Sequence, residues 1–193
     1  VDKVDGLAQF TLTMWVNFSK IDANDRLLSD GGAPSGNPLI EGFDLLAGTD
    51  STANNLLLGL SVDGTSANSG VRIDAQDKWV FIAVTYDGTL TESNVAFYAG
   101  GLSLGVTRLG GLVSLNKGPV GDNDRPFRIG DTTQTTSDRT PTGYFDDVRV
   151  YSGVASQEFL DGVRLANVPE PSTALLLLGG VMGAGALRWR RKA

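Results

Sequence analysis

The sequence predicts an all-β protein, a sandwich of two antiparallel sheets. In residues 10–18 the side chains of Phe10, Leu12, Met14, Val16 and Phe18 fall on one face of a strand, and more polar ones fall on the other. Residues 79–86 are apolar on both faces, which is typical of a central strand that is covered on both sides. Short segments of this kind recur between Gly- and Asp-rich turns, as in a sandwich.

Further strands are expected along the whole chain. They cover 56–62, 71–74, 94–99, 127–130 and 144–151. In the last of them Tyr144, Asp146, Val148 and Val150 are expected to share one face, because side chains alternate along a strand. The pairs Asp63-Gly64 and Asp87-Gly88 provide turn residues between strands.

One short helix is expected over residues 156–165. Ser156 is suited to the N-cap, and Phe159, Leu160 and Val163 form a narrow apolar stripe.

The composition excludes several classes of chemistry. The chain has 193 residues and contains neither cysteine nor histidine, which rules out disulfides, a Ser-His-Asp triad and imidazole ligands to zinc. Of its 16 basic residues four follow Leu187, so the preceding part carries 12 basic against 22 acidic residues, a net charge of −10. Such a body repels nucleic acid, and no nucleic-acid partner is expected. Neutral glycans or divalent cations suit this charge better.

The C-terminal end consists of three zones. Residues 167–172 hold Pro169, Glu170 and Pro171, whose prolines favour an extended backbone. Residues 173–187 are uncharged and apolar all round, which predicts a hydrophobic helix that crosses the membrane. Residues 188–193 follow as a basic end on the cytoplasmic side; its cations are Arg188, Arg190, Arg191 and Lys192.

The apolar zone is short for a permanent anchor. Its fifteen residues reach roughly 22 Å as a helix, against about 30 Å of hydrocarbon. It would span only with local thinning or with snorkelling arginines, which favours a processed signal over a lasting anchor.

The order of these zones resembles the PEP-CTERM sorting signal, in which a Pro-Glu-Pro motif, a hydrophobic helix and an arginine-rich end follow one another. The resemblance implies recognition near Pro169–Pro171 by an exosortase, in a Gram-negative bacterium that makes exopolysaccharide. The protein is then expected to be exported, inserted in the inner membrane by its tail with the body outside the cytoplasm, and finally placed at the cell surface or released.

Four segments of the body resemble the laminin-G-like, concanavalin A-like jelly-roll family. They are residues 10–16, the hairpin over 79–101, residues 127–130 and residues 143–156. The resemblance implies a jelly-roll domain over residues 1–166. Because the family opens with one more strand before residue 10, the chain is expected to be a mature form or a fragment.

Catalysis is not expected, although the same fold hosts glucanases. Those enzymes need two carboxylates close together across a cleft. The body has three glutamates, Glu41, Glu92 and Glu158, and none lies in a Glu-x-Asp-x-Glu pattern. We therefore expect a surface or matrix protein that binds carbohydrate or a protein partner. A glycan hydrolase or lyase with an unfamiliar site is the alternative, and a purely structural module is a third interpretation.

Calcium is the one cofactor that the resemblance implies. Relatives hold a structural calcium with an aspartate at the start of the closing strand, and Asp146 occupies the matching position. On the face of Val148 and Val150 an unpaired carboxylate would be costly if buried, and a cation would relieve that cost. A half-exposed aspartate near a strand end is the competing interpretation.

Two acid-rich loops are candidates for binding calcium or sugar hydroxyls. They contain Asp22 and Asp25 in one loop and Asp122 and Asp124 in the other. Solvated turn residues are the interpretation that we favour for both loops.

Glycan binding normally requires an exposed aromatic platform beside planar polar groups. Trp15 faces away from the main apolar row of its strand and is a candidate, with Tyr98 and Tyr144 behind it. Trp79 is expected to anchor the core. Structural use is the favoured interpretation for each of these rings.

Overall fold

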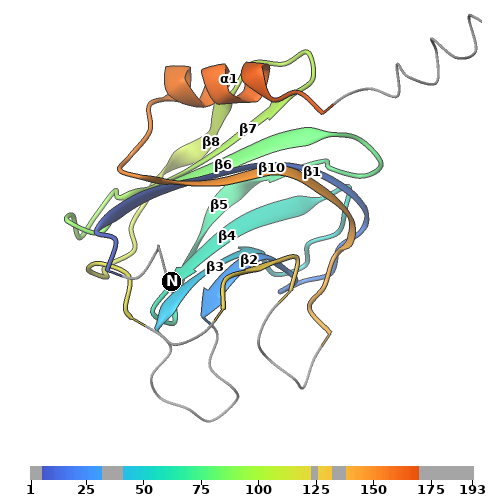
Figure 1. Ribbon diagram of the computed structural model, residues 1–193. Coiled ribbons are helices and arrows are strands. Elements are labelled where there is room, and N and C mark those ends of the chain that lie inside the picture. The colour runs from blue at the N-terminus through green and yellow to red at the C-terminus, as the bar shows by residue number, and fades with distance from the viewer. Residues whose placement is uncertain (1–5, 32–40, 123–125, 132–137, 170–193) are drawn as a thin grey trace, which may run out of the picture.

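The computed structural model describes residues 6–31, 41–122, 126–131 and 138–169. It confirms the sandwich of two five-stranded antiparallel sheets (Figure 1). Sheet A has the order β10 (Thr142–Ser152), β1 (Gln9–Lys20), β6 (Val80–Asp87), β7 (Val95–Gly101) and β8 (Thr107–Val113). Sheet B has the order β5 (Thr65–Ile73), β4 (Leu56–Val62), β3 (Gly42–Ala47), β2 (Arg26–Gly31) and β9 (Arg128–Ile129).

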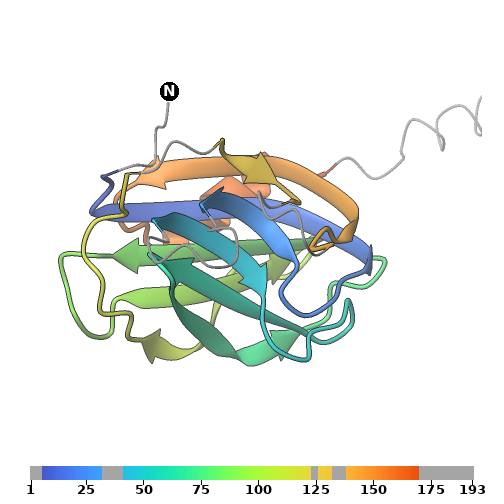
Figure 2. The same cartoon turned by 90° about the horizontal axis from the view of Figure 1, so that it is seen from below.

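The main core lies between the two sheets. The expected apolar row of β1 is completely buried there, and Phe10 meets Phe43 of β3 with ring centroids 5.2 Å apart. The side opposite to the helix is seen in Figure 2, with strands of sheet B in front of sheet A. Burial of such a continuous apolar layer is the main force that holds a fold without disulfides together.

A second, smaller core covers the outer face of sheet A. There β6 contributes Phe81 and Ala83, and α1 (Gln157–Ala166) contributes Leu160 and Val163. The prediction that β6 is a central strand covered on both faces is therefore confirmed.

The helix itself begins as expected but turns another face to the sheet. The Ser156 hydroxyl accepts a hydrogen bond from the Phe159 amide at 3.2 Å and so caps the first turn. Leu160 and Val163 are buried, whereas Phe159 is half exposed and Arg164 takes the remaining buried place. The predicted stripe was wrong in that one position.

The predicted face of β10 was also wrong, because the strand contains a β-bulge. The register against β1 shifts between Thr13 and Trp15, which pair with Arg149 and Asp146. Asp147 has a positive φ of 47° at this point. The extra residue breaks the alternation, so that both Phe145 and Val148 pack against the main core, whereas Tyr144 and Asp146 are exposed.

In the part of the chain that the structure describes, no helix is long and apolar enough to cross a membrane. Residues 170–193, which include the predicted hydrophobic helix and basic end, lie outside the described residues.

Candidate functional site

Three side chains form a row across the outer face of sheet A, beyond the end of α1. Asn17 of β1 pairs with Tyr144 of β10, and Trp79 directly precedes β6, whose Val80 pairs with Val16. The Trp79 and Tyr144 rings lie 6.4 Å apart between centroids and are tilted by 45°. Tyr144 is 69% exposed, and Trp79 and Asn17 are half-buried. We call Trp79, Asn17 and Tyr144 the aromatic row.

Gly143 allows this row to form. A Cβ atom at Gly143 would collide with the Asn17 carbonyl oxygen and would lie 2.8 Å from the Phe18 Cα. Only glycine lets β10 approach β1 this closely, just before Tyr144.

A hollow of about 790 Å³ lies against Trp79, within the size range of small-ligand sites. One wall is the connection from β5 to β6, and the other is the turn from β7 to β8. Most of the lining is apolar. Its polar side chains are Asp74, Lys78, Ser103 and Thr107.

The charged pair at the rim of the hollow is internally neutralised. The Lys78 ammonium lies 2.5 Å from an Asp74 carboxylate oxygen. This hydrogen bond, together with one from the Gln76 amide, holds the pKa of Asp74 below its usual range. The pair therefore offers both a donor and an acceptor at neutral pH without adding net charge.

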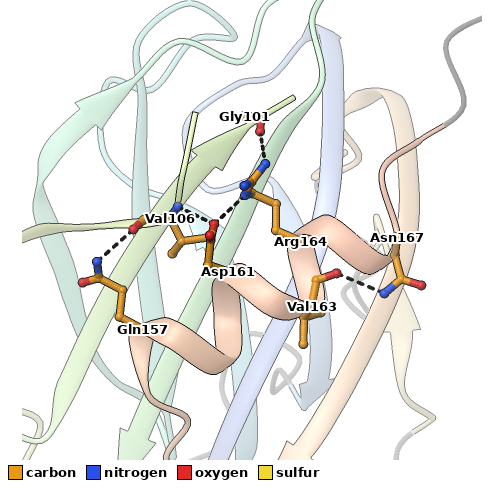
Figure 3. Close-up of polar contacts among 7 residues, drawn as sticks. All are labelled: Gly101, Val106, Gln157, Asp161, Val163, Arg164 and Asn167. Carbon is orange, nitrogen blue, oxygen red and sulfur yellow. Dashed lines mark hydrogen bonds and ion pairs between the residues drawn. The ribbon is translucent and has the colours of Figure 1, made fainter. Parts of the chain in front are cut away.

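Helix α1 fixes the second wall (Figure 3). The Asp161 carboxylate accepts hydrogen bonds from the Val106 amide at 2.9 Å and from the Arg164 Nε at 2.7 Å. Arg164 also donates to the Gly101 carbonyl at 2.8 Å, and Gln157 donates to the Val106 carbonyl at 2.9 Å. Both ends of the β7–β8 turn are thus held by the helix.

Comparison with known proteins agrees with this architecture. The family model of the concanavalin A-like lectin/glucanases superfamily matches residues 2–160. The chain belongs to that superfamily. Residues 167–192 match the PEP-CTERM protein-sorting motif, which confirms the resemblance of the tail. No curated protein matches the chain.

Two solved structures with a similar fold each share less than a fifth of their residues with this chain. Domain 4 of the arabinanase AbnA from Geobacillus stearothermophilus, in complex with arabinotriose, is 17% identical with a TM-score of 0.55, covering 82% of this chain and 67% of that one. CBM40 of the Ruminococcus gnavus IT-sialidase, bound to α2,3-sialyllactose, is 18% identical with a TM-score of 0.53, covering 82% and 83%. These likenesses establish the fold. A superfamily domain joined to this sorting signal fits an exported protein of the carbohydrate-binding type.

Trp15 does not belong to the exposed surface of this superfamily member, which supports the structural use that is favoured for this ring. The side chain is fully buried beneath α1 and meets Phe81 edge-on at 5.6 Å. The period of two placed Trp15 correctly on the outer face, but it could not show that a helix covers that face. Trp79 lies on the same face but is not covered by the helix. Because it is only half-buried, the prediction that it anchors the core holds only in part.

The premise for calcium at Asp146 was wrong. The Asp146 side chain is exposed at the bulge and accepts a hydrogen bond from the Asp147 amide at 2.8 Å. Burial therefore imposes no cost that a cation would relieve. Across the described residues, no three acidic side chains lie close enough together to hold a metal ion, and calcium binding at Asp146 stays a prediction.

The first acid-rich loop is built as a turn. The buried Asp25 carboxylate accepts a hydrogen bond from the Asp22 amide at 2.8 Å, and Asp22 forms an exposed ion pair with Lys20 at 2.6 Å. Burial raises the pKa of Asp25. These contacts support the turn interpretation. In the second loop Asp122 is exposed, and Asp124 lies outside the described residues.

The sorting motif begins at the last residue that the structure describes. Pro169 is buried, and Glu170, Pro171 and the four basic residues lie beyond the described part.

Proposed function

We propose that this protein is an exported, non-catalytic glycan-binding protein whose saccharide contacts the aromatic row. The observation that carries the proposal is the exposed Tyr144 ring beside Trp79 and the Asn17 amide. A pyranose ring presents an apolar C–H face that packs on an aromatic ring, while its hydroxyls need planar donors and acceptors. The row offers both kinds of contact on one surface.

The charge of the body points to a neutral saccharide. A net charge of −10 before the tail disfavours anionic sugars over neutral ones. The fold likeness to domain 4 of AbnA and to the CBM40 domain supports arabinotriose and α2,3-sialyllactose as a neutral and an anionic first probe. We expect the neutral probe class to bind better.

A glycan array on the purified protein tests this proposal, followed by calorimetry on the best neutral glycan. Trp79→Ala and Tyr144→Ala should each weaken binding by about two- to tenfold, because an aromatic contact contributes roughly 0.5–1.5 kcal/mol. Phe159→Ala, which removes a half-exposed ring outside the row, is the matched control and should bind like the wild type. If the folded wild-type protein binds no neutral glycan, the carbohydrate proposal is wrong.

The non-catalytic part of the proposal is supported by the acids near the row. Among the described residues that line the hollow, the one carboxylate is Asp74, which Lys78 neutralises. Glycoside hydrolysis uses two carboxylates roughly 5 to 9.5 Å apart. Release of reducing ends from polysaccharides would favour the alternative, a hydrolase or lyase.

We further propose that an exosortase processes the C-terminal signal. The tail would hold the chain in the inner membrane before processing, and the body would then reach the cell surface or the extracellular matrix. The match of residues 167–192 to the sorting motif supports this step.

A further inference from the structure

Exposed apolar side chains gather where the body leads into the sorting tail. The most exposed is Leu104 in the β7–β8 turn, at 72%, and Leu102 in the same turn is 46% exposed. Leu165 of α1 is 60% exposed, and Val168 is 37% exposed. We call Leu102, Leu104, Leu165 and Val168 the exit patch.

The contacts of α1 bring one side of the helix next to the β7–β8 turn. Asp161 and Leu165 are four residues apart and therefore lie on the same side of the helix. That side faces the β7–β8 turn, because Asp161 accepts from the Val106 amide and Arg164 donates to the Gly101 carbonyl (Figure 3). The turn and α1 project together from the outer face of sheet A (Figure 1).

The charged groups around the patch are neutralised. Arg164 is buried and ion-paired with Asp161 at 2.7 Å, so neither presents an unbalanced charge to the surface. Asn167 uses its amide in hydrogen bonds to the Val163 carbonyl and to Arg149. An apolar surface without net charge suits the apolar boundary of a lipid bilayer better than a polar partner.

The length of chain after the described part decides which partner lies within reach. The predicted hydrophobic helix begins at Thr173, four residues after Pro169. Even fully extended, this link spans only about 14 Å. A body tethered so closely meets the bilayer surface at a high effective concentration, so a small patch suffices for contact.

We propose that the exit patch rests on the outer surface of the bilayer while the tail is inserted. This inference rests on the proposed insertion of the tail. It gives the body a fixed orientation, with α1 and the β7–β8 turn toward the lipid and sheet B away from it. The acidic body makes zwitterionic lipid the expected partner.

The absence of cysteine permits a direct test. Full-length Leu104→Cys, Leu165→Cys and Leu90→Cys variants are spin-labelled and reconstituted in phosphatidylcholine vesicles. Leu90 is a half-exposed leucine in the β6–β7 turn, at the opposite end of the strands, and provides the matched control. Power saturation with oxygen and with a water-soluble nickel chelate then reports the depth of each label.

Labels at 104 and 165 should collide more with oxygen than with the chelate and report a depth of about 5–10 Å, while the label at 90 remains aqueous. Aqueous profiles at both 104 and 165, in protein that resists alkaline carbonate extraction, would overturn the patch but leave the insertion intact. Extraction by carbonate would instead show that the tail does not insert, and both proposals would fail. Dipolar broadening between labels at 104 would mean that a second copy covers the patch, which also overturns the inference.

Discussion

Tyr86 illustrates how a single polar atom is accommodated in the main core. The residue is fully buried, and its ring lies 5.2 Å from that of Phe10. Its hydroxyl lies 2.8 Å from the carbonyl oxygens of Lys117 and Gly118, which attaches the segment after β8 to the sandwich. Burial raises the pKa of Tyr86 to about 12.

This pKa predicts a loss of stability in alkaline solution. The unfolded chain releases the phenol proton near pH 10, while the folded protein retains it until about pH 12. The contribution is therefore complete below pH 10 and is lost as the pH rises toward 12, by up to about 3 kcal/mol. Urea unfolding between pH 8 and pH 12 measures it. Tyr86→Phe should remove this component of the pH dependence, and an unchanged fall in the variant would contradict the assignment.

A single glycine, Gly100, also decides how a neighbouring side chain packs. At Gly100 a Cβ atom would lie 2.9 Å from the Arg164 Cδ. The missing side chain lets the arginine stem lie flat on sheet A beneath the helix.

At the scale of elements, α1 and the β7–β8 turn form one unit. Three hydrogen bonds, made by Gln157, Asp161 and Arg164, connect the helix to the turn. A fourth, from Arg164 to Asp161, lies within the helix and orients both side chains. The helix thereby holds a wall of the hollow and also aligns the exit patch. The ion pair and the amide hydrogen bond to Val106 keep the pKa of Asp161 below its usual range, so these bonds persist at neutral pH.

Loss of Arg164 should loosen this unit. Arg164→Ala removes a buried stem and the donor to Gly101, and we expect it to lower the free energy of unfolding by about 1–3 kcal/mol. The Val106 amide, bonded to Asp161, should exchange faster with deuterium. Arg108→Ala, at an exposed arginine of β8, is the matched control. Equal exchange at Val106 in both variants would show that Arg164 does not stabilise the hydrogen bond between Asp161 and the Val106 amide.

At the scale of the whole molecule, a folded sandwich precedes a short link to the sorting signal. Pro169, the first residue of the Pro-Glu-Pro motif, is still buried and follows α1 by only three residues. The proposed processing would therefore take place within a few residues of a folded domain.

Replacing both prolines of the motif tests this arrangement in the native host. In Pro169→Ala/Pro171→Ala protein, the extended backbone is no longer enforced, and we expect the uncleaved chain to accumulate in the membrane fraction. Immunoblots of membrane and extracellular fractions measure this. Pro126→Ala, at an exposed proline of the body, should be processed normally. Equal release of the double variant would refute recognition at this motif.

The sequence predicted those strands whose apolar pattern is strong. Residues 56–62 coincide with β4, the prediction over 10–18 lies inside β1, and the prediction over 79–86 lies within one residue of β6 at each end. β2, β3 and β8 were missed, because they are short or contain Gly110, Gly111 and charged residues that weaken the periodic signal. Their pairing in the sheets is decided by neighbouring strands that are distant in sequence.

The aromatic row was predicted only in fragments. The sequence offers Tyr144 as a candidate ring and predicts a core position for Trp79, and no local pattern marks Asn17 as a ligand. Each lies on a different strand, and no local pattern reports that these strands are adjacent. The alternation within β1 did place Asn17 and Trp15 on one face. It could not show that α1 covers the Trp15 ring and leaves the Asn17 amide partly exposed.

The sequence by itself determined the all-β class, the central position of β6 and the sorting signal, because periodicity, apolar runs and the Pro-Glu-Pro motif are local properties of the chain. Only the tertiary structure decided which face α1 covers, where the bulge in β10 reverses the alternation, and which rings remain open to a ligand. These outcomes depend on contacts between residues more than a hundred positions apart, such as Asn17 with Tyr144. The adjacency of such pairs is settled by packing of the whole sandwich, which no short segment encodes.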